Sequence, residues 1–225
     1  METTFIITID GPAGSGKSST AKAVAEKLEF LFLDSGALYR AITLAALEQN
    51  IDLHDPGQVK ELAQSCKIDL RQVNRDLLVF LDDRDVTEHI RNPKVTRAIA
   101  PIAAMPEVRE ELVNRMREMA KEQSLVAEGR DMGSVVFQQA DLKIYMQATI
   151  GERAHRRQQE LKQKGIQVSL QDLEEEIARR DHSDANRAHG PLVKPQDALV
   201  LDTSSMTLEE QVDWVVAKAR KRGAR

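Results

Sequence analysis

A glycine-rich segment at positions 11–18, Gly-Pro-Ala-Gly-Ser-Gly-Lys-Ser, constrains this chain more than any other feature. It follows a β-branched apolar run at positions 5–10 and precedes a segment whose apolar residues recur at helical spacing. A strand, a glycine-rich turn and a helix in this order direct backbone N–H groups at a phosphate. The pattern GxxxxGK[ST] therefore predicts a nucleoside triphosphate site, with Lys17 reaching the β- and γ-phosphates and the Ser18 hydroxyl coordinating Mg²⁺. The alternative is a glycine-rich turn with a surface lysine.

The rest of the chain alternates between strand-like and helix-like segments, which is typical of a parallel α/β sheet. Strands are predicted at 5–10, 30–33, 124–128, 142–146 and 198–202, and helices from Lys17, over 37–49 and from Thr207. The predicted fold class is α/β, a P-loop NTPase-type parallel sheet of about five strands flanked by helices. We expect one domain over residues 1–225, since domains run to roughly 250 residues.

Two segments interrupt the alternation. The first holds two short strand candidates at 68–73 and 77–81 and a helix capped by Asn92 with Pro93 behind it, which indicates a small α+β insertion over about 36–105. The second holds two charged helices with capping sequences at 149–152 and 169–172. We expect this segment, about 149–190, to form a short helical lid.

Composition excludes several classes of protein. The net charge of −4 argues against a nucleic-acid coat or a polybasic membrane binder, and no apolar run approaches the length of a membrane span. A hydrophobic content of 41% suffices for a packed core. The single cysteine, Cys66, excludes an internal disulfide and favours the cytoplasm. The five histidines form no tight metal-ligand pattern.

Five motifs extend over nearly the whole chain: IDGPAGSGK at 9–17, DSGALYR at 34–40, EGRDMG at 128–133, ERAHRR at 152–157 and RDHSDANR at 180–187. In this order they resemble the bacterial cytidylate kinases, P-loop nucleoside monophosphate kinases. The resemblance implies transfer of the γ-phosphoryl group of ATP to CMP or dCMP, with Mg²⁺, in pyrimidine nucleotide metabolism. It also implies nucleotides as the only partners, no nucleic acid or membrane, and a monomer.

The resemblance further implies which residues form the two substrate sites. The ATP site would comprise Gly11, Pro12, Ala13, Gly14, Ser15, Gly16, Lys17, Ser18, Ser19, Arg153 and Arg157. The acceptor site would comprise Ser35, Tyr39, Arg40, Arg109, Gly129, Arg130, Asp131, Arg180, Asp184 and Arg187, with Lys17, Arg130, Arg153 and Arg157 acting in catalysis. One departure is Ala100, where many members carry a serine that contacts the nucleotide, so discrimination of CMP from UMP stays open.

Helical spacing bears on several of these arginines. Arg40 is expected in the first turn of its helix, where a cation is mildly unfavourable and an anionic partner would rationalise it. Arg153 has no acid three or four residues away, so we expect an external anion as its partner, whereas Arg156 has Glu152 and Glu160 at that spacing.

Two assignments from spacing stay open. Glu176, Arg180 and Asp184 are spaced so that a salt-bridged helix face is an alternative to a ligand site. Glu128 ends a predicted strand and is a candidate for a position close to the Mg²⁺ ion.

Two rival functions remain. A P-loop kinase for a small hydroxyl metabolite would use Asp34 as general base. A nucleotide switch of the GTPase type would need an Asn-Lys-x-Asp sequence, which is absent from the chain. An acceptor phosphate already carries an ionised oxygen, so phosphoryl transfer to it requires placed cations and no base. Arginine outnumbers lysine 19 to 13, which favours bidentate binding of phosphate groups. A kinase for a hydroxyl metabolite would leave the EGRD and RDHSDANR segments unexplained.

Overall fold

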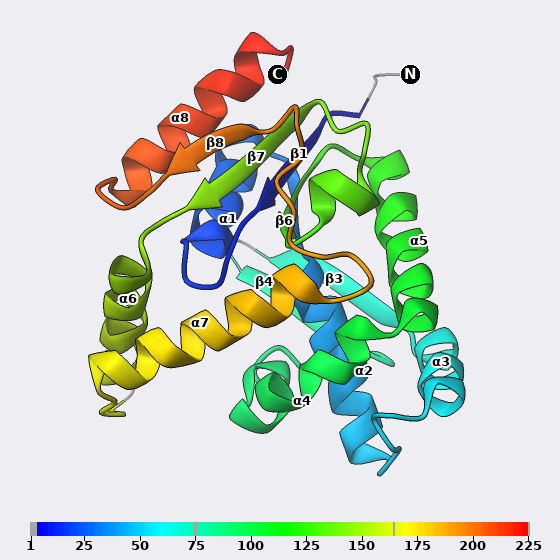
Figure 1. The fold of residues 1–225 in the computed structure, drawn as a ribbon. Coiled ribbons are helices and arrows are strands. Elements are labelled where there is room, and N and C mark those ends of the chain that lie inside the picture. Colours follow the sequence, from blue (N-terminus) through cyan, green and yellow to red (C-terminus); the bar gives the residue numbers. More distant parts are fainter. Residues whose placement is uncertain (1–3, 74–75, 164, 225) are drawn as a thin grey trace.

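The central sheet of the computed structural model, which describes residues 4–73, 76–163 and 165–224, has five parallel strands (Figure 1). They are arranged in the order β2 (Leu31–Asp34), β6 (Leu125–Gly129), β1 (Ile6–Asp10), β7 (Leu142–Gln147) and β8 (Leu199–Asp202). The predicted fold class is confirmed. Since all five strands run the same way, their carboxyl ends share one edge of the sheet, where open α/β sheets bind ligands.

Strand β1 lies in the middle of the sheet and is covered on both faces. Ile7 and Ile9 are fully buried on one face, and Thr8 and Asp10 are buried on the other. Its register places Asp10 beside Gly129 of β6 and beside Tyr145 of β7. The end of β1 is therefore adjacent to the start of the EGRDMG motif.

Helices α1 (Lys17–Leu28) and α8 (Leu208–Lys221) pack against each other, and α1 also contacts β2 and β6. A capping box opens α8, the helix predicted from Thr207: the Thr207 hydroxyl accepts from the Glu210 amide and the Glu210 side chain accepts from the Thr207 amide. Helix α5 (Pro106–Glu122) buries Val108, Leu112 and Met116, which recur at helical spacing along one face. These helices bury the apolar faces of the sheet and leave its carboxyl edge accessible.

The chain between β2 and α5 contains helix α2 (Ser35–Glu48), helix α3 (Pro56–Ser65), a 3₁₀ turn at His89–Arg91 and helix α4 (Pro93–Ala104). Between them, β3 (Ile68–Val73), β4 (Asp76–Leu81) and β5 (Arg84–Asp85) form an antiparallel sheet. Both predicted strands are present, and Asn92 caps α4 as expected. Ala100 is exposed on α4.

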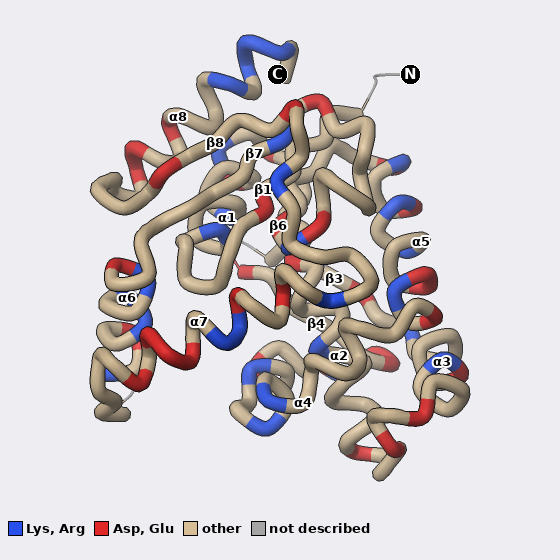
Figure 2. The backbone as a smooth tube through the Cα atoms, viewed as in Figure 1, with Lys and Arg blue, Asp and Glu red and all other residues tan. Residues whose placement is uncertain are grey.

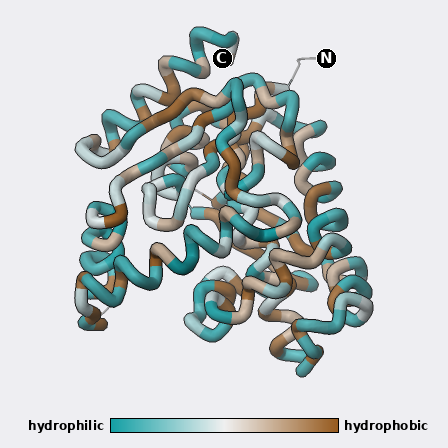
Figure 3. The backbone as a smooth tube through the Cα atoms, in the orientation of Figure 1, coloured by the Kyte–Doolittle hydropathy of each residue, from teal (hydrophilic) through white to brown (hydrophobic). Residues whose placement is uncertain are grey.

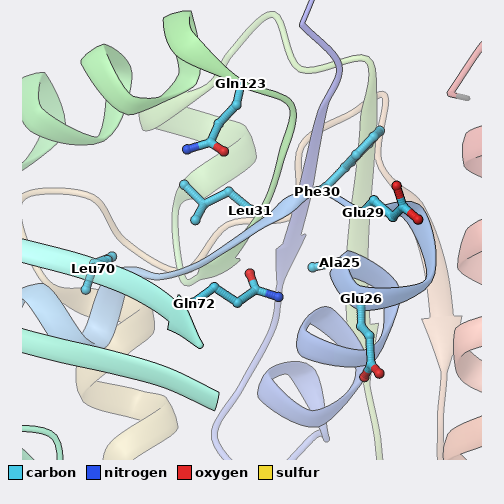
Figure 4. Close-up of a pocket in the computed structure, with 8 residues that line it drawn as sticks. All are labelled: Ala25, Glu26, Glu29, Phe30, Leu31, Leu70, Gln72 and Gln123. Carbon is cyan, nitrogen blue, oxygen red and sulfur yellow. The ribbon is translucent and has the colours of Figure 1, made fainter. Parts of the chain in front are cut away.

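An open groove of about 520 Å³ lies where β3 meets the edge strand β2 (Figure 4). Its walls come from the end of α1, from Phe30 and Leu31, and from Leu70 and Gln72. The Gln72 side-chain oxygen accepts a hydrogen bond from the Phe32 amide at 3.2 Å, which satisfies a donor on the free edge of the sheet. None of the predicted site residues lines this groove.

Helices α6 (Ile150–Gln163) and α7 (Leu170–Asn186) form a hairpin that starts after β7, at the carboxyl edge of the sheet (Figure 1). Acidic and basic residues alternate along both helices (Figure 2), and α7 is mostly hydrophilic (Figure 3). Ala154, Leu173 and Ile177 form a small apolar cluster between them, separate from the main core. With so little apolar contact, this hairpin depends strongly on its polar contacts to the rest of the molecule.

Two local features differ from the expectations. Helix α2 begins at Ser35, two residues early, because the Asp34 side chain accepts a hydrogen bond from the Ala37 amide and caps the helix there. A π-helical turn, Met132–Val136, follows the EGRD sequence, where no element is predicted. Such turns are rare and often occur at functional sites.

Candidate functional site

The glycine-rich loop joins β1 to α1 at the carboxyl edge of the sheet, as its pattern predicts. Gly11 lies against β7, and a Cβ there would be 2.1 Å from the Met146 carbonyl oxygen. Gly16 precedes α1 with a left-handed backbone (φ 93°) and provides no side-chain cap. The first amides of α1 are thus left free to bind an anion at the positive end of the helix.

Lys17 is buried in this loop, and its Nζ donates to the Pro12 carbonyl oxygen at 2.7 Å. Burial lowers the pKa of Lys17 to about 7, and the positive charge of Arg130 adds to the shift, while Glu128 opposes it. A phosphate group at the loop would place a negative charge beside the buried amine and so favour its protonated form.

Ser18 and Ser35 both bind Glu128, a buried residue near the end of β6. The Ser18 hydroxyl donates to the Glu128 carboxylate at 2.5 Å, and the Ser35 hydroxyl donates to the Glu128 backbone oxygen at 2.8 Å. Burial raises the pKa of Glu128, and the charge of Asp34 raises it further, against the effect of Lys17. Residues from β6, α1 and α2 therefore meet at one point.

Arg40 lies in the second turn of α2, so the prediction that it occupies the first turn is wrong. Its Nη2 donates to the Asp34 carboxylate at 2.8 Å, and that carboxylate also caps the helix. An internal anion thus compensates this cation. The Arg40 Nε is buried without a hydrogen-bond partner among the described residues, which leaves one donor of the guanidinium for a ligand.

A buried cluster forms around Asp131. Its carboxylate accepts hydrogen bonds from Arg109 and, at 3.3 Å, from Arg187, and the Arg109 guanidinium lies 5.8 Å from the Tyr39 ring centre. Burial raises the pKa of Asp131, although both guanidiniums lower it. The four residues come from α2, α5, the loop after β6 and the end of α7, and all four belong to the predicted acceptor site.

Arg130 and Arg180 lie close to the loop lysine. Arg130 donates to the Asp184 carboxylate at 2.6 Å, so the alternative of a salt-bridged face running along α7 through Asp184 is wrong. Arg180 makes no ion pair within 4.0 Å among the residues that the structure describes. Arg180 is exposed, but partial desolvation still lowers its pKa. The positive charges of the neighbouring arginines lower this pKa further, whereas the negative charge of Asp184 raises it.

The lid arginines have partners that helical spacing does not reveal. Arg153 is buried and donates to Asp181 of α7 at 2.6 Å and to the Ala13 carbonyl of the loop at 3.0 Å. Helical spacing on α6 alone missed this internal partner, because the acid lies on the neighbouring helix; the external anion stays a prediction. Glu160 pairs with Arg157 at 3.1 Å instead of with Arg156.

Arg156 contacts the phosphate-binding loop, which sequence reasoning missed. It pairs with Glu152 as expected, but it also donates to the Thr203 carbonyl at 2.6 Å and to the Ser15 carbonyl at 3.4 Å. Because the salt bridge to Glu152 already accounts for Arg156 within its own helix, the sequence offered no reason to expect a contact with the loop. Arg157 is half-exposed, and its charge acts on Arg180 of α7. No described helix is both long and apolar enough to cross a membrane.

Comparison with known proteins agrees with this arrangement. A family model described as cytidylate kinase matches residues 7–221. Cytidylate kinases of Bacillus cereus (strain ATCC 10987 / NRS 248) and Bacillus thuringiensis (strain Al Hakam) are each 45% identical to this chain, with 96% of both chains covered. A crystal structure of an uncharacterized protein from Eubacterium ventriosum ATCC 27560 shares the fold, with a TM-score of 0.55 at 12% identity over 96% of this chain and 99% of that one. The chain belongs to the cytidylate kinase family.

Proposed function

We propose that this enzyme transfers the γ-phosphoryl group of ATP to CMP or dCMP, giving ADP and CDP or dCDP. One observation carries the proposal: Arg130 and Arg180 lie close enough to Lys17 to act on its charge. Burial lowers the pKa of Lys17 and of Arg180, and the positive charge of Arg130 lowers both further. Gathering cations in this way is unfavourable unless a polyanion binds among them. Membership of the cytidylate kinase family supports CMP as the acceptor.

The glycine-rich loop would hold the triphosphate. Its members from Gly11 to Ser19 surround the amino terminus of α1, and Arg153 spans from α6 to the Ala13 carbonyl. Arg157 would join them from the cleft side when ATP binds. The lid would also exclude water from the transferred group, which limits hydrolysis.

The acceptor would bind between α2, the EGRDMG loop and α7. Asp131 with Arg109 and Arg187 would bind the base, Arg40 and Arg130 the phosphate, and Arg180 and Asp184 the sugar. Each of the predicted phosphate ligands already has an internal carboxylate partner, at 2.8 Å for Arg40 and 2.6 Å for Arg130. Phosphate binding would therefore exchange one anion for another, which reduces the desolvation cost.

Transfer needs alignment and charge neutralisation in place of a general base. Asp34 is the base that a hydroxyl-metabolite kinase would use, but here its two oxygens accept from the Ala37 amide and from Arg40. Both carboxylate oxygens therefore already accept hydrogen bonds from donors within the protein. This observation and the family membership disfavour a small hydroxyl compound as acceptor.

Magnesium fits the oxygen atoms beside the loop. Mg²⁺ is usually bound through one or two protein oxygens together with phosphates and water, and Ser18 with Glu128 supplies such a pair. Among the described residues, no group of three or more His, Cys, Asp or Glu side chains is placed to hold a metal ion. When bound, the ion would neutralise charge on the transferred phosphoryl group. The cytoplasmic location, the monomeric state and the boundaries of insertion and lid remain predictions from the sequence.

An acceptor panel tests the proposal. ADP release would be measured with CMP, dCMP, UMP, AMP, GMP and shikimate, each at the same ATP and Mg²⁺ concentrations. We expect CMP and dCMP to give the highest kcat/KM. Turnover with shikimate and none with CMP would contradict the proposal.

Adjacent arginines of α7 provide a matched pair of variants. Arg180→Met should lower kcat/KM for CMP by about 10²-fold, because a positioned cation that binds the acceptor is lost. Arg179→Met should leave it within about twofold, because Arg179 is exposed and pairs with Glu175 on the surface at 3.7 Å. Steady-state kinetics of both variants checks this, and equal losses would contradict the placement of Arg180 in the site.

Binding of ATP should take up protons. With a pKa of about 7, Lys17 is mostly neutral at pH 8 in the free enzyme, and phosphate contact should restore its charge. We expect uptake of about 0.9 proton per ATP at pH 8 without Mg²⁺, when ATP itself carries no titrating proton. Calorimetry in two buffers of different ionisation enthalpy measures it. Lys17→Arg keeps the charge at all pH values and should abolish the uptake, so persistence in that variant would assign it elsewhere.

A further inference from the structure

Asp10 is a buried carboxylate to which the proposed reaction gives no role. It is the last residue of β1 and is 1% exposed. Its two oxygens accept hydrogen bonds from the Met132 amide at 2.8 Å and from the Gly133 amide at 2.7 Å. One side chain on the central strand therefore binds both leading amides of the π-helical turn.

The position of Asp10 connects the two substrate sites. The next residue, Gly11, begins the loop proposed to hold ATP, and the amides that Asp10 binds follow directly after Arg130 and Asp131. Those two residues are proposed to bind the acceptor phosphate and base. The Asp10 hydrogen bonds therefore hold the backbone immediately after Arg130 and Asp131, and this backbone determines where the two side chains are placed.

Packing holds the same turn against the sheet. A Cβ at Gly133 would lie 2.8 Å from the Thr8 hydroxyl and 3.3 Å from both the Asp10 carboxylate and the Lys143 side chain. The turn therefore rests directly on β1 and β7, and its position follows that of Asp10. Thr8, two residues earlier on the same face, is fully buried, and its hydroxyl has no hydrogen-bond partner among the described residues.

Keeping a carboxylate here is costly for the fold. Burial raises the pKa of Asp10 to about 6, although the Gly133 and Met132 amides lower it. An apolar residue on this face would avoid the desolvation of a charge. A residue that lowers stability in this way is typical of a functional site, where precise placement of a loop is retained at the expense of stability.

We propose that Asp10 is a positioning residue for the acceptor site: by binding the Met132 and Gly133 amides, it fixes the Arg130–Asp131 segment relative to the ATP loop. The inference rests on the proposed function. It concerns alignment and assigns Asp10 no contact with either substrate.

The variant Asp10→Asn tests the inference because its amide oxygen can accept one of the two hydrogen bonds while its NH₂ group must face the other donor. We expect the Kd for CMP, measured by calorimetry without ATP, to rise about tenfold or more. The Kd for ATP, measured without CMP, should stay within about threefold. Thr8→Val is the matched control, since it alters the same buried face and removes no hydrogen bond, and both of its Kd values should match the wild type.

Two outcomes would overturn the inference: a Kd for CMP in Asp10→Asn within twofold of the wild type, or equal weakening of CMP and ATP. Hydrogen exchange at the Met132 and Gly133 amides provides a second measurement that needs no variant. Both amides should exchange slowly in the free wild-type enzyme and more slowly with CMP, and fast exchange in both states would also overturn it. Wild-type enzyme that does not bind CMP would instead refute the proposed function.

Discussion

Lys17→Met should lower kcat by about 10²–10³-fold, because it removes the cation proposed to contact the transferred phosphate while keeping a similar side-chain volume. The effect should fall on kcat more than on the KM for CMP, since Lys17 belongs to the ATP loop. Steady-state kinetics with saturating ATP and varied CMP measures both quantities. Lys22→Met is the control on the same helix: Lys22 pairs with Asp76 at the surface, at 2.8 Å, and its loss should change kcat less than twofold.

The same variant should not lose stability. Because burial lowers the folded-state pKa of Lys17 to about 7, the unfolded chain binds more protons between pH 7 and the ordinary pKa of lysine. The lysine therefore costs the free enzyme stability at neutral pH, and this cost diminishes as the pH rises. We expect Lys17→Met to melt at or above the wild-type temperature at pH 7 in the absence of nucleotide. A variant that is both inactive and markedly less stable would mean that the lost activity reports misfolding.

Most secondary structure of this chain could be predicted because its signals are local. The strand–loop–helix at residues 6–28, the capping box at Thr207 and Glu210, and the apolar stripe of α5 each depend on residues a few positions apart. Boundaries moved by one or two residues where a side chain intervenes, as the Asp34 cap does for α2. The family resemblance, carried by five motifs in order, was confirmed by the match over residues 7–221.

The partners of the site arginines could not be predicted, because the relevant acids are distant in the sequence. Arg153 pairs with Asp181, 28 residues away, and Arg130 with Asp184, 54 residues away. Helical spacing tests only neighbours on the same helix, so it reported no acid near Arg153 and offered a wrong partner for Asp184. The role of Asp10 was hidden for a similar reason: it reads as the end of a strand, and its partners are backbone amides 122 and 123 residues later.

Arg130→Met should lower kcat/KM for CMP by about 10³-fold, since Arg130 is the buried cation shared between the EGRDMG loop and α7. Burial lowers the pKa of Arg130, but the Asp184 carboxylate, together with the charges of Glu128 and Asp10, raises it by more, so the acids around Arg130 favour its charged form. Removing the guanidinium leaves Asp184 largely desolvated and should destabilise the fold by about 1–3 kcal/mol, measured by urea denaturation.

The double variant Arg130→Met with Asp184→Asn separates the two consequences. Replacing the stranded carboxylate with a neutral amide should recover most of the lost stability, because no unpaired buried charge remains. It should recover none of the activity, because the cation proposed to bind the acceptor phosphate is still missing. Recovery of both would mean that Arg130 acts only by holding α7 in place. Recovery of stability with an activity far below that of the single variant Asp184→Asn, which keeps the Arg130 guanidinium and perturbs the proposed sugar contact, assigns the Arg130 charge to phosphoryl transfer.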